Sequence, residues 1–241
     1  ISGFFSLRSL INDALNLGGD IFIFYSVFLS RDIDLWAATQ IRKKFKNKWI
    51  IFLGNDPVWF LDKYLISENH IILRGEPEET IVDLIKELEN KKPNFKNIKG
   101  ISWKRNNKII HNSPRKYIED INKLPIPNRM LLKKPFAYPN ARFSKFPTTT
   151  MLTSRGCNNR CLFCFPNSLS FARELEWKNK YHVKPPVRIR SAEKVIEEFN
   201  TLYEQGFRSV SIVDDQFLWD RKRTEKILRG IKKFKFEISV L

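Results

Sequence analysis

Cysteine is scarce in this chain of 241 residues, and the little there is lies in one place. The three cysteines, Cys157, Cys161 and Cys164, fall within eight residues. An odd number of cysteines without distant partners argues against a disulfide-bonded secreted scaffold. A reducing cytoplasm is therefore the compartment that we expect.

Long apolar runs are also missing. No stretch approaches the run of about 20 apolar residues that a membrane-spanning helix needs, so we expect no membrane anchor. The chain begins at Ile1 without a basic-then-apolar signal segment. An apolar content of 42% still allows a buried core, and the length suits one large domain or two small ones.

Acidic residues are few in the middle of the chain. Residues 91–150 contain fifteen Lys and Arg against two Asp and Glu, whereas residues 1–90 contain ten against thirteen. The net charge of +17 therefore arises mainly in this middle segment. A basic stretch can bind phosphate backbones, but no nucleic-acid recognition motif accompanies it. We interpret it as a solvated Lys- and Asn-rich connector and expect no nucleic-acid partner.

Apolar strands and amphipathic helices alternate in the first part of the chain. Continuous apolar runs predict buried parallel strands at residues 21–28, 49–53 and 71–73. Apolar residues at helical spacing predict helices at residues 7–15, 36–45 and 81–88. The Asn-rich turn around Asn106 and Asn107 predicts a β-hairpin. Residues 1–112 are thus predicted to form an α/β domain with a parallel sheet.

A second α/β pattern follows a proline-rich segment. Six of the twelve prolines fall in residues 113–147, which predicts a linker between domains. Strand and helix patterns then alternate again over residues 148–241. Two and a half β/α units cannot close a barrel, so we expect the start of a TIM-like barrel that is truncated at its C-terminus.

The spacing of the cysteines limits what they can bind. The pattern C-x3-C-x2-C supplies three ligands, whereas a closed structural zinc site needs four. An iron–sulfur cubane held by three cysteines leaves one iron open. Zinc, with His182 as a fourth ligand, is the alternative. The other histidines, His70 and His111, are predicted to be ordinary surface or strand-end residues.

The cysteine motif resembles the signature of the radical S-adenosylmethionine (SAM) superfamily, with Phe163 directly before the last cysteine. The segments Thr153–Cys157 and Val213–Phe217 resemble the branch in which the barrel follows a cobalamin-binding-type domain. Further matches occur in that family's order at residues 20–28, 54–57, 74–80 and 121–127. The resemblance covers nearly the whole chain and implies a Rossmann-like, flavodoxin-like N-terminal domain before a radical SAM barrel.

The resemblance also implies cofactors and partners. Cys157, Cys161 and Cys164 would hold a 4Fe–4S cluster whose open iron chelates SAM. Reduction by a donor such as a flavodoxin or ferredoxin would yield a 5′-deoxyadenosyl radical that abstracts hydrogen from a small-molecule substrate. Phe163 would lie near the adenine, and Asp214 or Asp215 near the methionyl ammonium. No catalytic side chain is assigned beyond these cofactor contacts.

Cobalamin is the further cofactor that the resemblance implies. Ser26 and Gly54 would flank its nucleotide tail, and Gly75 and Glu76 lie at the next strand end. The chain departs from the usual pattern at Asn55, which stands where relatives have a second glycine. No Asp-x-His-x-x-Gly loop occurs. With cobalamin bound, methyl transfer to an unactivated carbon is the expected reaction, which makes the enzyme a transferase.

Two other functions stay open. A methylthiotransferase that modifies RNA has a similar barrel, but it needs additional N-terminal cysteines, which this chain does not have. A non-enzymatic module that binds zinc or RNA would also accommodate the cysteines and the basic segment.

Overall fold

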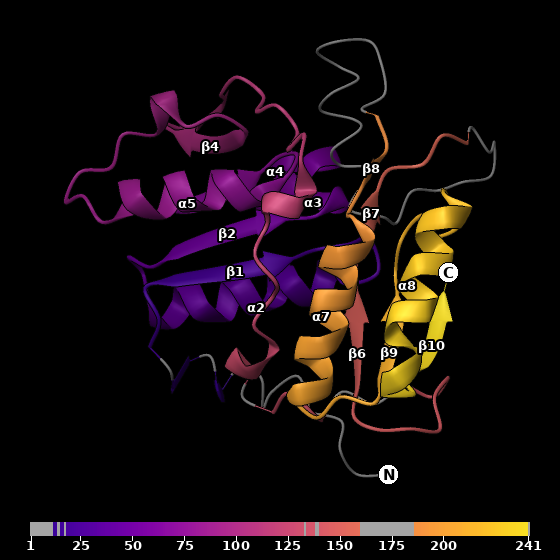
Figure 1. Cartoon of the computed structure of the whole chain (residues 1–241). Coiled ribbons are helices and arrows are strands. Elements are labelled where there is room, and N and C mark those ends of the chain that lie inside the picture. Colours follow the sequence, from indigo (N-terminus) through magenta and orange to yellow (C-terminus); the bar gives the residue numbers. More distant parts are fainter. Residues whose placement is uncertain are drawn as a thin grey trace. The chain divides into compact units, whose positions relative to one another are not determined.

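The computed structural model describes residues 12–13, 15–16, 18–132, 134–137, 140–159 and 186–240. The described residues separate into two compact units, which meet in the sequence between Tyr117 and Ile118 (Figure 1). The described residues up to Tyr117 form the first unit and those from Ile118 form the second.

The first unit is a five-stranded sheet with the order β1-β2-β3-β4-β5. Its strands are β1 (Ile21–Tyr25), β2 (Trp49–Leu53), β3 (His70–Leu73), β4 (Ile101–Arg105) and β5 (Lys108–His111). β1, β2 and β3 are parallel, while β4 and β5 are added antiparallel to them. Asn106 and Asn107 have positive φ angles of 48° and 62°, which the tight turn of a two-residue hairpin requires.

Helices cover both faces of this sheet. They are α2 (Arg31–Lys44), α3 (Asn55–Trp59), α4 (Leu61–Tyr64) and α5 (Pro77–Leu88), with the 3-10 turn η1 (Phe95–Asn97). Successive residues of a strand point to opposite faces. Accordingly, Ile50 and Phe52 pack in the core with α2 and α4, whereas Ile51 packs in the core with α5.

Two predictions for this unit need correction. The strand predicted at residues 21–28 ends at Tyr25, and it lies at the sheet edge, where the side chains of Ile23 and Tyr25 are exposed. A strand buried on both faces was therefore the wrong expectation. His70 is a strand-end residue as predicted, but it is completely buried, because β3 lies in the centre of the sheet.

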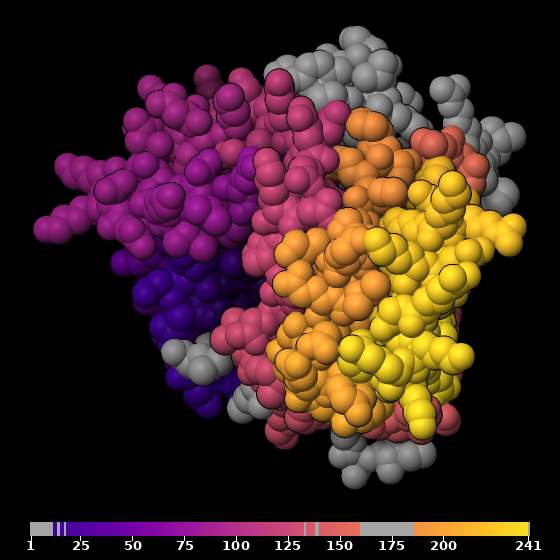
Figure 2. Space-filling view, in the orientation of Figure 1, coloured from indigo at the N-terminus to yellow at the C-terminus, as the bar shows by residue number. Residues whose placement is uncertain are grey.

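The second unit is built on a parallel sheet with the order β10-β9-β6. Its elements are β6 (Thr148–Met151), β7 (Ser154–Arg155), β8 (Arg188–Ile189), α7 (Ala192–Glu204), β9 (Ser209–Ile212), α8 (Arg221–Ile231), η4 (Lys232–Phe234) and β10 (Glu237–Val240). The helices α7 and α8 contact each other, and Figure 2 shows them next to each other in orange and yellow. Phe199 of α7 and Ile227 of α8 pack with Val210 of β9 in the core.

The proline-rich segment is attached to this second unit by a buried ion pair. It contains the 3-10 turns η2 (Ile121–Lys123) and η3 (Arg129–Leu131). Arg129 donates to the buried carboxylate of Glu198 at 2.6 Å and to the carbonyl oxygen of Thr150 at 2.7 Å. Arg190 donates to the other oxygen of Glu198 at 2.5 Å. Glu198 thus connects α7 to Arg129, which lies 69 positions earlier in the sequence.

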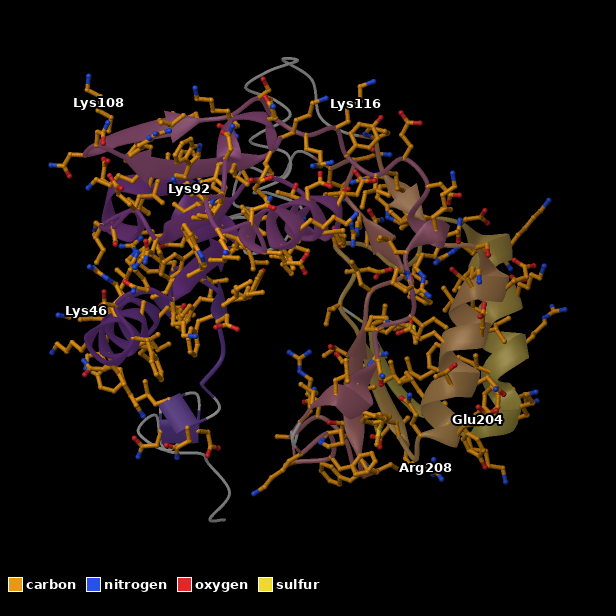
Figure 3. The ribbon with its side chains drawn as sticks, turned by 90° about the vertical axis from the view of Figure 1, so that its left-hand side faces the viewer. Lys46, Lys92, Lys108, Lys116, Glu204 and Arg208 are labelled. Carbon is orange, nitrogen blue, oxygen red and sulfur yellow. The ribbon has the colours of Figure 1, made fainter. Side chains whose placement is uncertain are left out.

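The mixed α/β fold with parallel sheets confirms the predicted fold class. The proposed boundaries at residues 112 and 147 stay predictions. Among the described helices, none has both the length and the apolar character needed to cross a membrane. The side chains of Lys46, Lys108 and Lys116 point away from the ribbon in Figure 3 and are exposed, as expected for solvated charges.

Candidate functional site

Cys157 is the one cysteine of the motif that lies within the described residues. It follows β7 after Gly156, whose φ of +95° is a conformation that favours glycine. The Cys157 side chain is half-buried and forms no disulfide. Cys161, Cys164, Phe163 and the alternative zinc ligand His182 all lie outside the described residues. Within the described ranges, no group of three or more potential metal ligands comes together.

The segment that carries the cysteines is closed at its base by the pairing of β7 with β8. Ser154 pairs with Ile189 and Arg155 with Arg188 in antiparallel register. The backbone N–H of Arg190 also donates to the carbonyl oxygen of Thr153 at 2.9 Å. The two ends of the segment 156–187 are therefore held side by side.

Asp214 contacts this base directly. It follows β9 and is only 2% exposed. Its Oδ1 accepts from the backbone N–H of Thr153 at 2.5 Å, and its Oδ2 accepts from the hydroxyls of Thr153 and Ser154 at 2.5 and 2.8 Å. Both carboxylate oxygens are thus bonded to the chain itself. Asp215, by contrast, is only half-buried.

Arg223 is a residue that the sequence analysis missed. It lies in the first turn of α8 and is 7% exposed. Its Nε donates to the carbonyl oxygen of Arg190 at 2.6 Å, and its Nη2 donates to that of Thr153 at 3.1 Å. Burial lowers the pKa of the Arg223 guanidinium, and the negative charge of Asp214 opposes that shift. No local motif distinguishes this arginine from the other basic residues of α8, Arg221, Lys222, Lys226 and Arg229.

The loop after β9 carries buried polar atoms that lack a hydrogen-bond partner. Within the described part of the chain, these include Oε1 of Gln216 and Nε1 of Trp219. Unpaired buried groups are costly, so each one calls for an explanation. Together with the donor set of three cysteines, they fit a loop that receives a polar ligand, and on that ground the residues suit a cluster with bound SAM.

Ser26 and Gly54 are brought together at the carboxyl ends of β1 and β2. Ser26 is completely buried, and its hydroxyl donates to Asp34 at 2.7 Å. A Cβ on Gly54 would lie 2.2 Å from the carbonyl oxygen of Ser26, and the φ of Gly54 is +113°. Glycine is therefore required here by the approach of the chain's own backbone, whether or not a ligand binds.

A buried ion pair lies beside them. Arg31 donates to both carboxylate oxygens of Asp56 at 2.5 and 2.6 Å, and the hydroxyl of Tyr64 donates to the same carboxylate at 2.6 Å. Burial by itself would raise the pKa of Asp56, but the hydrogen bonds from Arg31 and Tyr64 lower it overall. The Arg31 guanidinium also lies 4.1 Å from the centre of the Phe60 ring.

Gly75 and Glu76 follow β3, the next parallel strand of the same sheet. Gly75 has a φ of +78°, and a Cβ there would meet nothing within 4 Å. Glu76 is buried and precedes the first residue of α5. Phe28, Trp59 and Phe60, which follow β1 and β2, are 58%, 53% and 42% exposed. This edge of the unit therefore offers aromatic surface and open space, and it suits the apolar face of a corrin.

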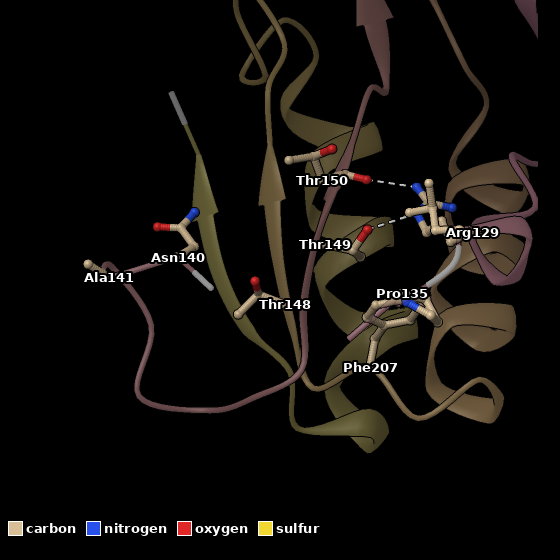
Figure 4. Close-up of a pocket in the computed structure, with 9 residues that line it drawn as sticks. Arg129, Pro135, Asn140, Ala141, Thr148, Thr149, Thr150 and Phe207 are labelled. Carbon is tan, nitrogen blue, oxygen red and sulfur yellow. Dashed lines mark hydrogen bonds between the residues drawn. The ribbon is translucent and has the colours of Figure 1, made fainter. Parts of the chain in front are cut away.

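A pocket of about 590 Å³ lies elsewhere in the second unit, lined by Arg129, Leu132, Pro135, Asn140, Ala141, Thr148, Thr149, Thr150 and Phe207 (Figure 4). Thr148 begins β6, whereas Cys157 follows the other end of that strand. Arg129 is also engaged, because it donates to Thr149 and Thr150 as well as to Glu198. This pocket is thus separate from the cysteine site.

The comparison with protein families finds the radical SAM superfamily at residues 151–241. An uncharacterized methyltransferase of Pyrococcus horikoshii is 30% identical over 210 residues, which are 86% of this chain and 42% of the relative. The anaerobic magnesium-protoporphyrin IX monomethyl ester cyclase of Synechocystis is 26% identical over 59% of this chain and 30% of its own length. The chain thus spans less than half of each of these relatives.

Solved structures of cobalamin-dependent radical enzymes share the fold. OxsB, solved with aqua-cobalamin and SAM bound, superimposes with a TM-score of 0.72 at 19% identity, covering 98% of this chain and 32% of OxsB. TsrM from Kitasatospora setae, a radical SAM methyltransferase solved with cobalamin and a [4Fe-4S] cluster, gives 0.61 at 12% identity over 94% of this chain and 43% of TsrM. Residues 151–241 thus match the radical SAM superfamily in sequence, and nearly the whole chain shares its fold with solved cobalamin-dependent radical SAM enzymes.

Proposed function

We propose that this chain forms the cofactor-binding part of a radical SAM enzyme, with a 4Fe–4S cluster held by Cys157, Cys161 and Cys164. The proposal rests on the C-x3-C-x2-C pattern and on its place shortly after the parallel strand β6, where Asp214 bonds Thr153. Three thiolates leave one iron open, and SAM bound there supplies a 5′-deoxyadenosyl radical that removes hydrogen from a substrate.

The residues around the cysteines have separate tasks in this proposal. Asp214 is buried at the base of the segment, whereas Asp215 is half-buried, so Asp215 is the more accessible candidate for the methionyl ammonium of SAM. Gln216 and Trp219 of the same loop supply further buried polar atoms. Phe163 contacts the adenine, as the family resemblance implies.

Cobalamin and methyl transfer form the finer part of the proposal. The support is the fold shared with cobalamin-dependent enzymes and the relative named as a methyltransferase. Ser26, Gly54, Gly75 and Glu76 mark the strand ends where cobalamin would bind, and the exposed aromatic rings beside them would cover its apolar face. A flavodoxin or ferredoxin supplies the electron, and the substrate is a small molecule.

Metal content after anaerobic reconstitution tests the cluster. We expect about four irons and four sulfides per chain, and a loss of most of them in Cys157→Ala and Cys161→Ala. Reduction in the presence of SAM should then release 5′-deoxyadenosine. Twice as much iron would indicate a methylthiotransferase, and tetrahedral zinc in anaerobically purified protein would indicate a binding module; either result refutes the proposal.

Absorption spectroscopy tests cobalamin separately. Protein incubated with hydroxocobalamin and then desalted should keep the corrin absorbance. Phe60→Ser should weaken retention, because it removes exposed aromatic surface beside the strand ends. Val82→Ser, at another exposed apolar position, on α5, is the matched control and should not change it. No retained absorbance in the wild-type chain would count against cobalamin without affecting the cluster.

A further inference from the structure

The cysteine-bearing segment 156–187 follows β7 and precedes β8, and Thr153 and Arg190 lie on the outer side of these two short strands. Thr153 and Ser154 are both buried, and only Arg155 and Gly156 separate Ser154 from Cys157. A shift in the position of Thr153 would therefore also move Cys157, because few residues separate them.

Asp214 fixes the outgoing end of the segment. It accepts three hydrogen bonds from two consecutive residues, Thr153 and Ser154, and it follows the neighbouring strand β9. A buried carboxylate with three donors is held in one orientation. Its contacts stop the chain from turning at Thr153, so the direction in which the chain leaves β6 is set by β9.

Arg223 joins the outgoing end to the returning end. One guanidinium donates to the carbonyl oxygens of both Thr153 and Arg190, which are themselves linked by a backbone hydrogen bond. The planar guanidinium presents its N–H groups in a fixed fork, so it can span two carbonyls. A lysine ammonium also has several N–H donors, but on a flexible stem and without the fixed fork, so it holds the two carbonyls less rigidly.

We propose that Asp214 and Arg223 are positioning residues that hold Thr153 and Arg190 together and thereby fix the position of Cys157. The inference rests on the proposed function for its link to a cluster. It does not require either residue to touch SAM or the metal. A salt link between the two side chains is not needed either, because each holds the segment through its own hydrogen bonds.

Hydrogen exchange of the metal-free protein tests the clasp without any cofactor. In Arg223→Met, the amides of Thr153 and Arg190 should exchange about tenfold faster or more, because the hydrogen bonds around them lose a charged partner. Arg223→Lys should restore only part of the protection, whereas a role that needs only positive charge would be fully rescued. Lys222→Met, at the exposed neighbouring position on the same helix, is the control. Unchanged exchange in Arg223→Met would overturn the inference.

Cluster lability tests the consequence for the ligands. After reconstitution, Arg223→Met and Asp214→Asn should lose iron to a chelator several-fold faster than wild type, with an altered electron paramagnetic resonance spectrum of the reduced cluster. If Arg223→Met does not fold, Arg223→Lys and Asp214→Asn carry the test. Equal iron loss and equal spectra in all variants would refute the clasp while leaving the proposed function intact. If the wild-type chain binds zinc while Arg223→Met still exchanges faster than wild type, the proposed function is refuted and the clasp stands.

Discussion

Arg31 and Arg223 occupy corresponding places in the two units, yet they do different work. Each lies in the first turn of the helix that follows a parallel strand, α2 after β1 and α8 after β9. Arg31 donates from Nε and Nη2 to one carboxylate, whereas Arg223 donates from Nε and Nη2 to two backbone carbonyls. The first arginine completes a pair of opposite charges, and the second ties two parts of the chain together.

At the strand ends of the first unit, charged side chains bond mainly one another. At those of the second unit, they bond the chain that leads to Cys157. In the first unit, Arg31, Asp56 and Tyr64 satisfy one another, and the buried hydroxyl of Ser26 is bonded to Asp34. In the second unit, Asp214 accepts from Thr153 and Ser154, which lead into the cysteines, and Arg223 donates to the carbonyl oxygens of Thr153 and Arg190. The two arginines have similar positions, so their different roles follow from their partners: a carboxylate for Arg31 and backbone carbonyls for Arg223.

Gly54→Ala should have the largest effect and should be confined to the first unit. The added Cβ would clash with the carbonyl oxygen of Ser26, and alanine disfavours a φ of +113°. We expect a loss of about 4–5 kcal/mol in the free energy of unfolding. Urea unfolding followed by peptide-resolved hydrogen exchange would measure it for each unit.

Gly19→Ala is the matched control for that experiment. A Cβ on Gly19 would meet its nearest atom at an ordinary 3.7 Å, so little change is expected. A Gly54→Ala protein as stable as wild type would contradict the close approach of β1 and β2 at their carboxyl ends.

A pair of Asp→Asn substitutions tests the comparison directly. Asp56→Asn removes the buried carboxylate that both Arg31 and Tyr64 bond, and it should destabilise the first unit by more than Asp214→Asn destabilises the second. Asp214→Asn should cost the second unit about 2 kcal/mol, because its three donors are neutral and the two hydroxyls can turn away. The same urea experiment measures both, with exposed Asp62→Asn as the control. Equal costs, or a larger cost at Asp214, would show that charge does not distinguish the two networks.

His70 makes the stability of the first unit depend on pH. Burial lowers its pKa to about 4, although its ring Nδ1 bonds the carbonyl oxygen of Tyr64. The unfolded chain, with an ordinary histidine pKa near 6.5, then binds more protons than the folded chain as pH falls from about 6.5 to about 4. Stability is fully present above this window and is lost within it, by about 2 kcal/mol between pH 7.5 and pH 5.

His70→Gln should remove this part of the pH dependence when urea unfolding is compared at pH 7.5 and pH 5. His111→Gln should remove less, because His111 is exposed at the end of β5. If wild type and His70→Gln lost the same stability on acidification, this would refute the claim that His70 is buried in its neutral form with a lowered pKa. The second unit, which has no histidine in its described part, provides an internal reference.

Local signals account for much of what could be predicted. The apolar runs located β2 and β3 to within a residue, and the two asparagines located the hairpin turn. These features depend on neighbours in the sequence, as does the cysteine spacing. The exposure of Ile23 and the burial of His70 were missed, because both follow from the order of strands in the sheet.

The sequence by itself determined the alternation of strands and helices, the glycine at residue 54 and a set of three closely spaced thiolates. Only the tertiary structure decided that Asp214 is occupied by the chain itself and that Arg223 reaches the base of the cysteine segment. Those hydrogen bonds join residues 61 and 70 positions apart. The physical reason is that a buried polar group bonds whatever the packing of strands brings within about 3 Å, and no local pattern encodes that neighbour.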